Sequence, residues 1–291
     1  MMLELSRAVQ RVLIRPEVSG VVVTQPADNI EETAYFVSIS LSDVFQNQNS
    51  KPIVFTTCMT PEDPMFDGTK NLLDSIRVAC HDVKGDIPTV VVCMNGEIHA
   101  ASRAQLTHTN KASALASPGW GPVGYVDRDN VYFRCGALEL DTGLNFPMLK
   151  KLTAKVPVVK AMCGDDGALL EMVLEKEPDA IIVEGFGRGN LPAGMMPAIK
   201  KAVKKGIFVV ISTRASSGRV LDSTVFPGSV AQCLESGCLL AGETTTDKAR
   251  LLLMYVLSQK EAIQLKKEDP ERFFAYVQEC LDPVLTNRLF G

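Results

Sequence analysis

The sequence predicts an α/β fold with two domains, a larger N-terminal domain that contains a mostly parallel sheet and a smaller C-terminal α/β domain. Short β-branched runs alternate with helical patterns, which is typical of strands joined by crossover helices. The chain has 291 residues, and a single hydrophobic core stops growing at roughly 250–300 residues. A weakly patterned stretch near the middle interrupts the alternation. We therefore expect two domains rather than one.

The first domain is expected to begin with strands and helices in strict alternation. The predicted strands are Val21–Thr24, Ile53–Thr57 and Thr89–Cys93, and the predicted helices between them are Glu31–Phe45 and Asn71–Cys80. Strands that are joined through helices run parallel. The carboxyl ends of these strands should therefore meet at one edge of the sheet, which is where open α/β sheets bind ligands.

The loop Gln25–Asp28 follows the first predicted strand and lies at that edge. Asn29 is predicted to cap the next helix, and Glu32 stands at the third helical position, where a carboxylate favours the positive end of the helix. Between Ile98 and Phe133 the pattern changes to short segments with turn residues, which predicts extended, hairpin-like structure that closes the domain.

The predicted boundaries place the N-terminal domain at residues 1–140, a linker at 141–155 and the C-terminal domain at 156–291. The second domain resumes the alternation of strands and helices. Its predicted strands are Val158–Ala161, Ala180–Val183 and Ile207–Ile211, and its predicted helices are Asp166–Glu175, Pro192–Lys204, Asp247–Lys267 and Pro270–Leu281.

Composition excludes several classes of protein and partner. The apolar fraction of 46% and the charged fraction of 22% are those of a folded globular protein. The net charge is -4 and no dense run of basic residues breaks the balance, so we expect no nucleic-acid partner. Nowhere do eighteen apolar residues run together, so we expect no membrane partner.

The cysteines and the start of the chain predict a cytoplasmic protein. Met1–Arg7 lacks the basic and apolar regions of a secretory signal. Cysteines that are spread thinly within apolar runs are typical of free thiols in a reducing compartment. The eight cysteines are Cys58, Cys80, Cys93, Cys135, Cys163, Cys233, Cys238 and Cys280.

A set of segments resembles the bacterial-type L-asparaginase and glutaminase family. The family's second signature normally reads Thr-His-Gly-Thr-Asp-Thr followed by Met-Glu-Glu-Thr-Ala, and Gly20–Phe36 is similar to it, with Gln25-Pro26-Ala27-Asp28 at its centre. Further similar segments follow in the family's order: Lys51–Met59, Asn71–Arg77, Val92–Asn95, Ser117–Tyr125, Asp166–Leu170, Gly185–Leu191 and Ser216–Val220. The resemblance implies an asparaginase-like fold that assembles as dimers or tetramers, with sites formed between the N-terminal domain of one subunit and the C-terminal domain of its neighbour.

The resemblance also implies that the chemistry of this family is lost. Its members use a threonine hydroxyl as nucleophile, and a second threonine shares a proton network with a lysine and an aspartate; a hydroxyl is a weak nucleophile until a neighbour takes its proton. At the matching positions Ala27 replaces the second threonine and Leu106 replaces the lysine, whereas Asp28 retains the aspartate. The first threonine's Thr-Gly-Gly-Thr-Ile strand has no counterpart, because Met1–Val18 corresponds to a later helix.

Five residues are candidates for ligand contacts. By the resemblance, Asp28 would hold a ligand's α-ammonium group, although it could equally cap the following helix. Gln25 and Thr57 lie at strand ends. Cys58 replaces an alanine near the substrate amide, either as a substitute nucleophile or, as we favour, as a small buried residue. Arg188 replaces an asparagine in the second domain and would bind a carboxylate through two N–H groups, unless it is an exposed loop residue.

Other motifs favour structural interpretations. Gly185-x-Gly187-x-Gly189 does not have dinucleotide-binding spacing and predicts a tight strand-to-helix turn. Asp165-Asp166 could be paired catalytic carboxylates, but a capping role at the helix start is favoured. Cys80 beside His81, and Cys93 six residues before His99, do not have the spacing of metal ligands. We predict no metal and no cofactor.

The leading hypothesis is a degenerate asparaginase homologue that keeps an amino-acid-sized pocket and has a binding or regulatory role. The alternative is an active amidohydrolase or related acyl-chemistry enzyme in which Cys58 or a partner subunit replaces the missing groups. A translation start upstream of Met1 is a third possibility. The expected partners are a small amino-acid-like ligand and either further copies of the chain, as a homo-oligomer, or a partner protein that supplies the missing strand, because an exposed sheet edge invites pairing.

Overall fold

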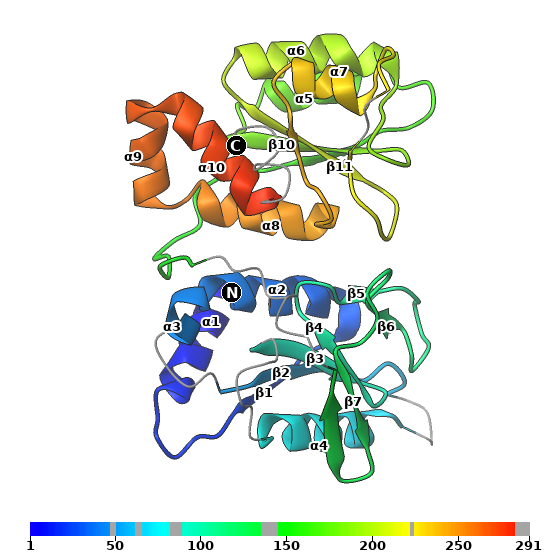
Figure 1. Cartoon of the computed structure of the whole chain (residues 1–291), viewed down its shortest axis with the longest axis vertical. Helices are drawn as coiled ribbons and strands as arrows, with labels where there is room; N and C mark the ends of the chain where they lie inside the picture. The colour runs from blue at the N-terminus through cyan, green and yellow to red at the C-terminus, as the bar shows by residue number, and fades with distance from the viewer. Residues whose placement is uncertain (47–50, 62–65, 82–88, 135–144, 222–223, 283–291) are drawn as a thin grey trace. The chain divides into compact units, whose positions relative to one another are not determined.

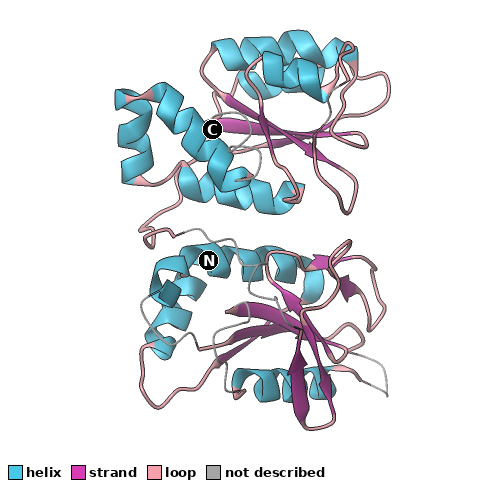
Figure 2. Cartoon of the chain, viewed as in Figure 1, coloured by secondary structure: helices cyan, strands magenta, loops and turns pink. Residues whose placement is uncertain are grey.

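The computed structural model describes residues 1–46, 51–61, 66–81, 89–134, 145–221 and 224–282. The chain forms two compact units, Met1–Lys150 (unit 1) and Lys151–Gly291 (unit 2). Helices cover both faces of a sheet in each unit (Figures 1 and 2). The predicted α/β class is confirmed: the sheet of unit 1 contains a parallel portion at the predicted strands, and the sheet of unit 2 is parallel. The first part of the predicted linker, 141–144, lies outside the described residues.

Unit 1 contains a six-stranded mixed sheet. Its strand order is β1-β2-β3-β4-β7-β8, with β1, β2 and β3 parallel and the later neighbours antiparallel. A small antiparallel pair, β5 and β6, lies apart from it. The strands are β1 Val21–Thr24, β2 Ile53–Thr56, β3 Val90–Met94, β4 Glu97–Ala100, β5 Gln105–Leu106, β6 Leu115–Ala116, β7 Gly124–Asp127 and β8 Asn130–Phe133. The predicted hairpin-like region is therefore confirmed.

Alternating strand residues bury the two faces of this sheet against different helices. Ile53 and Phe55 of β2 belong to the core cluster on the side of α1 and α2, whereas Val54 belongs to the cluster on the side of α4. All three side chains are fully buried. The helices of unit 1 are α1 Met2–Leu13, α2 Ile30–Ser40, α3 Ser42–Gln46 and α4 Gly68–Ala79, with a 3-10 turn η1 at Ala27–Asn29.

Two local predictions for unit 1 are wrong. The expected helix Glu31–Phe45 is divided, because α2 ends at Ser40 and the short α3 begins at Ser42. Asn29 occupies the position before α2, but its side chain caps no backbone N–H. The turn η1 precedes the helix, and the Asn29 Oδ1 atom instead accepts a hydrogen bond from Gln25 Nε2 at 3.3 Å. The side chain therefore fixes the loop rather than the helix end.

Unit 2 contains a four-stranded parallel sheet in the order β12-β11-β10-β9. Helices α5, α6 and α7 lie on one face, and α8, α9 and α10 lie on the other (Figure 1). The strands are β9 Val158–Lys160, β10 Ala180–Gly185, β11 Phe208–Thr213 and β12 Leu239–Leu240; the helices are α5 Ala168–Leu174, α6 Met196–Lys204, α7 Val230–Glu235, α8 Thr246–Val256, α9 Lys260–Glu268 and α10 Pro270–Leu281, with a 3-10 turn η3 at Ala193–Met195.

The predicted single helix Asp247–Lys267 is wrong, because α8 ends at Val256 and α9 starts at Lys260. The interruption places Ser258 where its Oγ atom accepts hydrogen bonds from the backbone N–H groups of Thr153 at 2.9 Å and Ala154 at 3.1 Å. Because the helix is interrupted, Ser258 accepts hydrogen bonds from a distant segment of the chain.

Candidate functional site

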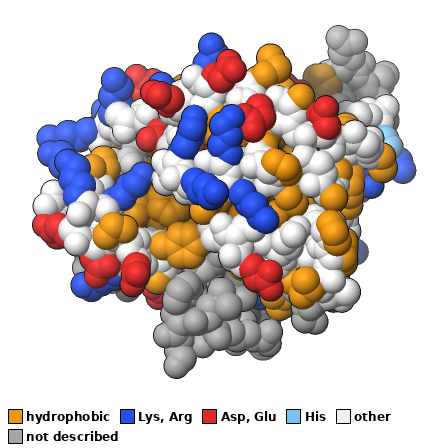
Figure 3. Space-filling view, turned by 90° about the horizontal axis from the view of Figure 1, so that it is seen from above, with side chains coloured by type: hydrophobic (Ala, Val, Ile, Leu, Met, Phe, Trp, Pro, Cys, Tyr) orange, Lys and Arg blue, Asp and Glu red, His pale blue; other side chains and the backbone are white. Residues whose placement is uncertain are grey.

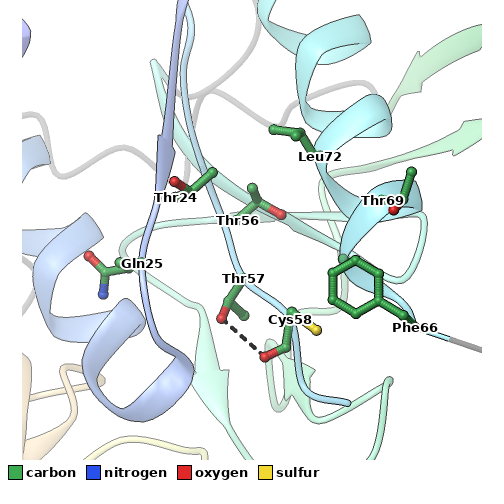
Figure 4. A pocket seen from close by; sticks show the side chains of 9 residues that line it. Thr24, Gln25, Thr56, Thr57, Cys58, Phe66, Thr69 and Leu72 are labelled. Carbon is green, nitrogen blue, oxygen red and sulfur yellow. Dashed lines mark hydrogen bonds between the residues drawn. The ribbon is translucent and has the colours of Figure 1, made fainter. Parts of the chain in front are cut away.

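A cavity of about 410 Å³ lies at the carboxyl ends of β1 and β2, beside the start of α4 (Figure 4). We call it the strand-end cavity. It brings together three predicted site residues, Gln25, Thr57 and Cys58, and none of the described residues that line it carries a charged side chain. The described residues that line it are Thr24, Gln25, Thr56, Thr57, Cys58, Phe66, Gly68, Thr69 and Leu72.

The register between β1 and β2 places the ends of the two strands side by side, so the cavity residues that follow them are neighbours. Thr24 and Thr56 are register partners, and the backbone N–H of Gln25 donates to the carbonyl of Thr56 at 3.3 Å. Parallel strands end side by side, so residues just beyond both strands face the same space. The Thr56 hydroxyl donates to the carbonyl of Cys93 at 2.9 Å, which fixes this side chain to the neighbouring strand β3.

Asp67, the residue before α4, organises the loop that follows β2. Its carboxylate accepts hydrogen bonds from the Cys58 thiol at 2.9 Å, from the backbone N–H groups of Met59 and Thr60 at 3.1–3.2 Å, and from the Thr60 hydroxyl at 3.0 Å. Asn71 Nδ2 donates to the same carboxylate at 3.1 Å. This side chain therefore holds Cys58 against the start of the helix.

Asn71 links the ends of two parallel strands. Its buried side chain donates from Nδ2 to the carbonyl of Thr57 at 3.0 Å, and its Oδ1 atom accepts from the backbone N–H of Asn95 at 2.9 Å. Each contact satisfies a backbone group that the sheet itself leaves unpaired. The amide thus sets the distance between the residues that follow β2 and those that follow β3.

The electrostatics of this loop determine the state of the thiol. Burial raises the pKa of the Cys58 thiol, and both the hydrogen bond to Asp67 and the negative charge of Asp67 raise it further. Burial opposes ionisation of Asp67, but the bonds that its carboxylate accepts from Cys58, Met59 and Thr60 outweigh burial and lower the pKa of this carboxyl. At neutral pH, Cys58 is consequently a protonated donor, and a thiol in this state is a poor nucleophile.

The two positions matched to the family's second threonine and lysine do not line the strand-end cavity. Ala27 is half-buried on η1. Leu106, on β5, packs its side chain against the core cluster that contains α2, while its backbone N–H donates to a carboxylate oxygen of Glu31. Asp28 is exposed on η1, three residues after Gln25. Neither Ala27 nor Leu106 offers a side-chain group that can exchange a proton.

Arg188 lies in unit 2, in the turn after β10. Its side chain is exposed, and its Nε atom donates to the carbonyl of Leu221. The predicted tight turn is present, because the backbone N–H of Phe186 donates to the carbonyl of Asn190 at 2.8 Å and Gly189 has a positive φ of 105°. The turn is therefore built from backbone bonds and does not depend on the side chain of Arg188.

Asp165 and Asp166 lie just before α5 and accept hydrogen bonds from backbone groups there. Their Oδ1 atoms accept hydrogen bonds from the backbone N–H groups of Gly167 at 2.9 Å and Ala168 at 3.0 Å. These bonds occupy N–H groups that a helix start leaves unpaired. The carboxylates therefore hold the turn that leads into α5, but the predicted cap is wrong, because the N-cap residue of α5 is Gly167 and no side chain caps this helix.

Two contributors to the cavity region were not recognised from the sequence, Asp67 and Asn71. The available signal was weak: an aspartate directly before a helical pattern, with Asn71 one turn further on. A capping residue explains such an aspartate without any further role. Only the folded chain shows that both side chains reach back to the loop after β2.

Surface charge, metal ligands, helix hydropathy and cysteine state limit the kinds of site that the described residues can form. Basic and acidic side chains are both present on the face drawn in Figure 3. Within the described part of the chain, no cluster of three His, Cys, Asp or Glu residues could hold a metal ion, and no helix is both long and apolar enough to cross a membrane. All seven described cysteines are free thiols, with Cys80 and Cys163 exposed, while Cys135 lies outside the described residues.

Together, the fold and the cavity define an α/β protein with a candidate site at the carboxyl ends of parallel strands in its N-terminal unit. Residues 1–137 match the family described as Asparaginase, N-terminal, and residues 155–268 match the Glutaminase/Asparaginase C-terminal domain. The chain belongs to the asparaginase and glutaminase family.

Individual relatives agree with this assignment. The chain is 31% identical to the L-asparaginase of Bacillus licheniformis over 268 residues, 91% of this chain and 80% of the relative. It is 29% identical to L-asparaginase 2 of Bacillus subtilis, covering 96% of this chain and 69% of the relative. The crystal structure of a probable cytoplasmic L-asparaginase from Campylobacter jejuni matches with a TM-score of 0.78 and 26% identity, covering 96% of this chain and 82% of that one.

Proposed function

We propose that this chain is an asparaginase-family protein that has lost threonine-dependent amide hydrolysis and binds a small amino-acid-like ligand at the strand-end cavity. The observation that carries the proposal is the replacement of both proton-transfer side chains by Ala27 and Leu106. Groups that act as one catalytic unit are not replaceable singly, and losing members of the unit costs orders of magnitude in rate. The fold is retained while the chemistry is not, which favours a binding or regulatory role.

The cavity chemistry supports a ligand whose enclosed part is uncharged. A volume of about 410 Å³ lies within the ordinary range for small-molecule sites. The described lining residues offer the hydroxyl of Thr57, the amide of Gln25 and the apolar surface of Phe66, and none of them has a charged side chain. Enclosing an unpaired charge there would be costly. We propose that a side chain or amide enters the cavity, and that Asp28 binds the ammonium group outside it.

Because the family resemblance implies sites shared between subunits, Arg188 of a neighbouring copy of the chain is the proposed contact for a ligand carboxylate. A guanidinium binds a carboxylate through two parallel N–H bonds, which an asparagine does not do. The Nε atom of Arg188 is engaged by the carbonyl of Leu221, which orients the guanidinium. An Arg188→Asn substitution, which installs the family residue, separates this role from the role of Asp28.

A thermal-shift screen tests the binding proposal directly. L-asparagine, L-glutamine, L-aspartate and L-glutamate would be compared with their uncharged side-chain analogues. A ligand at about 100 times its Kd adds about 2.7 kcal/mol of stability, or about 5–10 °C in Tm. Asp28→Ala and Thr57→Val should remove the shift, and Asp166→Ala on the turn before α5 should retain it. No shift with any of these compounds, or a shift that survives both substitutions, contradicts the proposal.

A second candidate is an active amidohydrolase that uses Cys58, because this thiol lines the cavity. The raised pKa of the Cys58 thiol argues against this candidate, because the thiolate is the form that attacks a carbonyl. None of the described histidines lines the cavity to accept the thiol proton. Ammonia release from any of the amides that Cys58→Ala abolishes would favour this candidate, and release that Cys58→Ala leaves unchanged would remove it.

We also propose a cytoplasmic, oligomeric protein. The seven free thiols support a reducing compartment. Sedimentation velocity of the purified chain measures its state of association, for which we expect a dimer or a tetramer, or a stable complex with a partner protein. A monomer that also lacks a partner contradicts this part of the proposal.

A further inference from the structure

The strand-end cavity has a polar side and an apolar side. Phe66, just before α4, and Leu72, on α4, form the apolar side. Gln25 and Thr57, which carry an amide and a hydroxyl, follow the ends of β1 and β2 and form the polar side. Figure 4 shows Phe66 and Gln25 on opposite sides of Cys58. A ligand in this cavity therefore meets two different surfaces.

A glycine allows the ring of Phe66 to form the apolar side. A Cβ atom at Gly68 would lie 2.8 Å from the Cε2 atom of the Phe66 ring and still closer to its Cζ atom. Carbon atoms that are not bonded to each other prefer a separation of about 3.5–4.0 Å. Because position 68 has no side chain, the ring can fold back over the start of α4. The aromatic surface is thus in place before any ligand binds.

Two lining groups that could donate to an amide ligand donate to the protein instead. The Thr56 hydroxyl donates to the carbonyl of Cys93 at 2.9 Å, and the Cys58 thiol donates to the carboxylate of Asp67 at 2.9 Å. Each of these groups has a single hydrogen. Neither group can therefore also donate to the carbonyl oxygen of a ligand.

The other polar groups of the described lining lie on the polar side or belong to exposed residues. The Thr57 hydroxyl makes only a long bond of 3.5 Å, to the carbonyl of Cys58, which leaves it able to contact a ligand. Thr24 and Thr69 are exposed, so water competes for bonds to their hydroxyls. An amide placed against Phe66 would thus exchange good bonds with water for poorer ones, which is unfavourable.

We propose that the ligand of the strand-end cavity is an amino acid with a large apolar side chain: leucine, methionine or phenylalanine. Its side chain would lie against Phe66 and Leu72, and its α-amino group would lie on the polar side, toward Asp28, three residues after Gln25. This inference rests on the binding function proposed above and adds the chemical class of the ligand.

Leucine and asparagine form an informative pair because their side chains have nearly the same shape. The branch of leucine ends in two methyl groups, whereas that of asparagine ends in an oxygen and an amino group. A surface formed by Phe66 and Leu72 favours the methyl groups, because apolar groups leave water favourably and polar groups do not. We expect leucine to bind at least about tenfold more tightly than asparagine, and methionine more tightly than glutamine by a similar factor.

Isothermal titration calorimetry of the full chain measures these affinities. The five probes are L-leucine, L-methionine, L-phenylalanine, L-asparagine and L-glutamine. The Kd of each apolar amino acid should be at least about tenfold lower than the Kd of either amide. Titrations of leucine at several temperatures should also give a negative heat-capacity change, because binding buries apolar surface.

Matched variants locate the apolar side chain of the ligand. Phe66→Ala and Leu72→Ala should each weaken the binding of leucine at least about fivefold. Leu73→Ala is the control and should leave the Kd unchanged, because Leu73 lies on the same helix and is 47% exposed against 41% for Leu72, but does not line the cavity. Far-ultraviolet circular dichroism checks that each variant is folded.

A double-mutant cycle tests the role of the glycine. Gly68→Ala should weaken leucine binding, because the added methyl group displaces the ring of Phe66. In a chain that already carries Phe66→Ala, the same substitution should have no further effect on the Kd. An equal loss in both backgrounds would contradict this account of the apolar side.

The possible failures can be told apart. Asparagine that binds as tightly as leucine, or more tightly, would overturn this inference and leave the proposed binding function standing. Binding of none of the five amino acids would remove the binding function itself. Leucine binding that Leu72→Ala and Leu73→Ala weaken equally, or that neither weakens, would place the apolar side chain elsewhere and overturn the inference.

Discussion

The turns that follow β1 in unit 1 and β10 in unit 2 differ in how they are held. After β10, the bond from the N–H of Phe186 to the carbonyl of Asn190 closes the turn, and Asn190 Oδ1 accepts from the N–H of Val230 at 3.1 Å. After β1, a side-chain bond between Gln25 and Asn29 spans the loop. A turn held by backbone bonds tolerates side-chain replacement, whereas a loop held by side chains changes with its sequence.

The strands before these turns differ as well. β10 lies between β9 and β11 and is almost entirely buried, whereas β1 has one described neighbour and three partly buried valines. The replaced residue Ala27 and the candidate contacts Gln25, Thr57 and Cys58 all lie in unit 1. Most of the candidate contacts therefore lie beside the less buried strand β1, whereas Arg188 lies in the backbone-held turn of unit 2.

The largest expected effect concerns the buried carboxylates of the two units. Asp74 in unit 1 and Asp282 in unit 2 are 2% and 4% exposed, and each is paired with arginine. Removing one partner of a buried ion pair lowers protein stability by about 3–5 kcal/mol. The loss should be near the lower end of this range where the remaining cation is accessible to water. Asp74→Ala and Asp282→Ala should both lower the free energy of unfolding in urea by about 3 kcal/mol.

If Asp74→Ala lowers the free energy of unfolding much less than Asp282→Ala does, the ion pairs of Asp74 do not stabilise α4 in unit 1 as the structure indicates. Asp74→Asn separates loss of charge from loss of packing. It should retain part of the stability, because the amide still accepts from Arg77 at the 3.0 Å position.

A smaller effect is expected for Asp67→Asn, about 1–3 kcal/mol at neutral pH, because the charged acceptor of several bonds is lost. The folded chain lowers the pKa of this carboxyl. Its contribution is therefore complete above the unfolded pKa of about 4 and is lost as pH falls through the lower folded pKa.

Urea unfolding from pH 7 to pH 2 measures this contribution. The parent chain should lose more stability than Asp67→Asn over the acid range. Asp166→Asn, which alters a carboxylate in unit 2 with no resolved role in the cavity, serves as the control and should follow the parent. Equal acid slopes in the parent and in Asp67→Asn contradict the assigned hydrogen bonds.

The smallest expected effect is one of labelling rate. Cys58 should react with iodoacetamide at pH 8 at least about tenfold more slowly than the exposed Cys163 of unit 2, because a raised pKa leaves little thiolate. Asp67→Asn should accelerate labelling of Cys58 and leave Cys163 unchanged. Mass spectrometry of the labelled peptides measures both rates, and faster labelling of Cys58 than of Cys163 would contradict its protonated state.

Much of the fold and part of the site could be predicted from the sequence. The strand Val21–Thr24 has the predicted bounds, because a β-branched run bounded by glycine and a proline-containing loop has few alternatives. Gln25, Thr57 and Cys58 meet because the carboxyl ends of parallel strands meet. These predictions depend only on local pattern and on the geometry of parallel sheets.

The remaining features depend on contacts between distant residues. The break in the predicted helix Asp247–Lys267 follows from bonds that Ser258 accepts from Thr153 and Ala154, and no local pattern contains them. The role of Asp67 depends on where the loop after β2 returns to α4. The position of β1 at one end of the described sheet follows from strand order, which local sequence does not specify.

Ammonia release from L-asparagine and L-glutamine by the purified chain tests the central claim most directly. The claim is that the chain of this family no longer performs threonine-dependent hydrolysis. An active L-asparaginase assayed in parallel is the positive control, and the Cys58→Ala variant is assayed beside the parent. The account predicts no release above buffer from the parent or the variant. Release that rises in proportion to the concentration of the parent chain, at rates near those of the control enzyme, would contradict it.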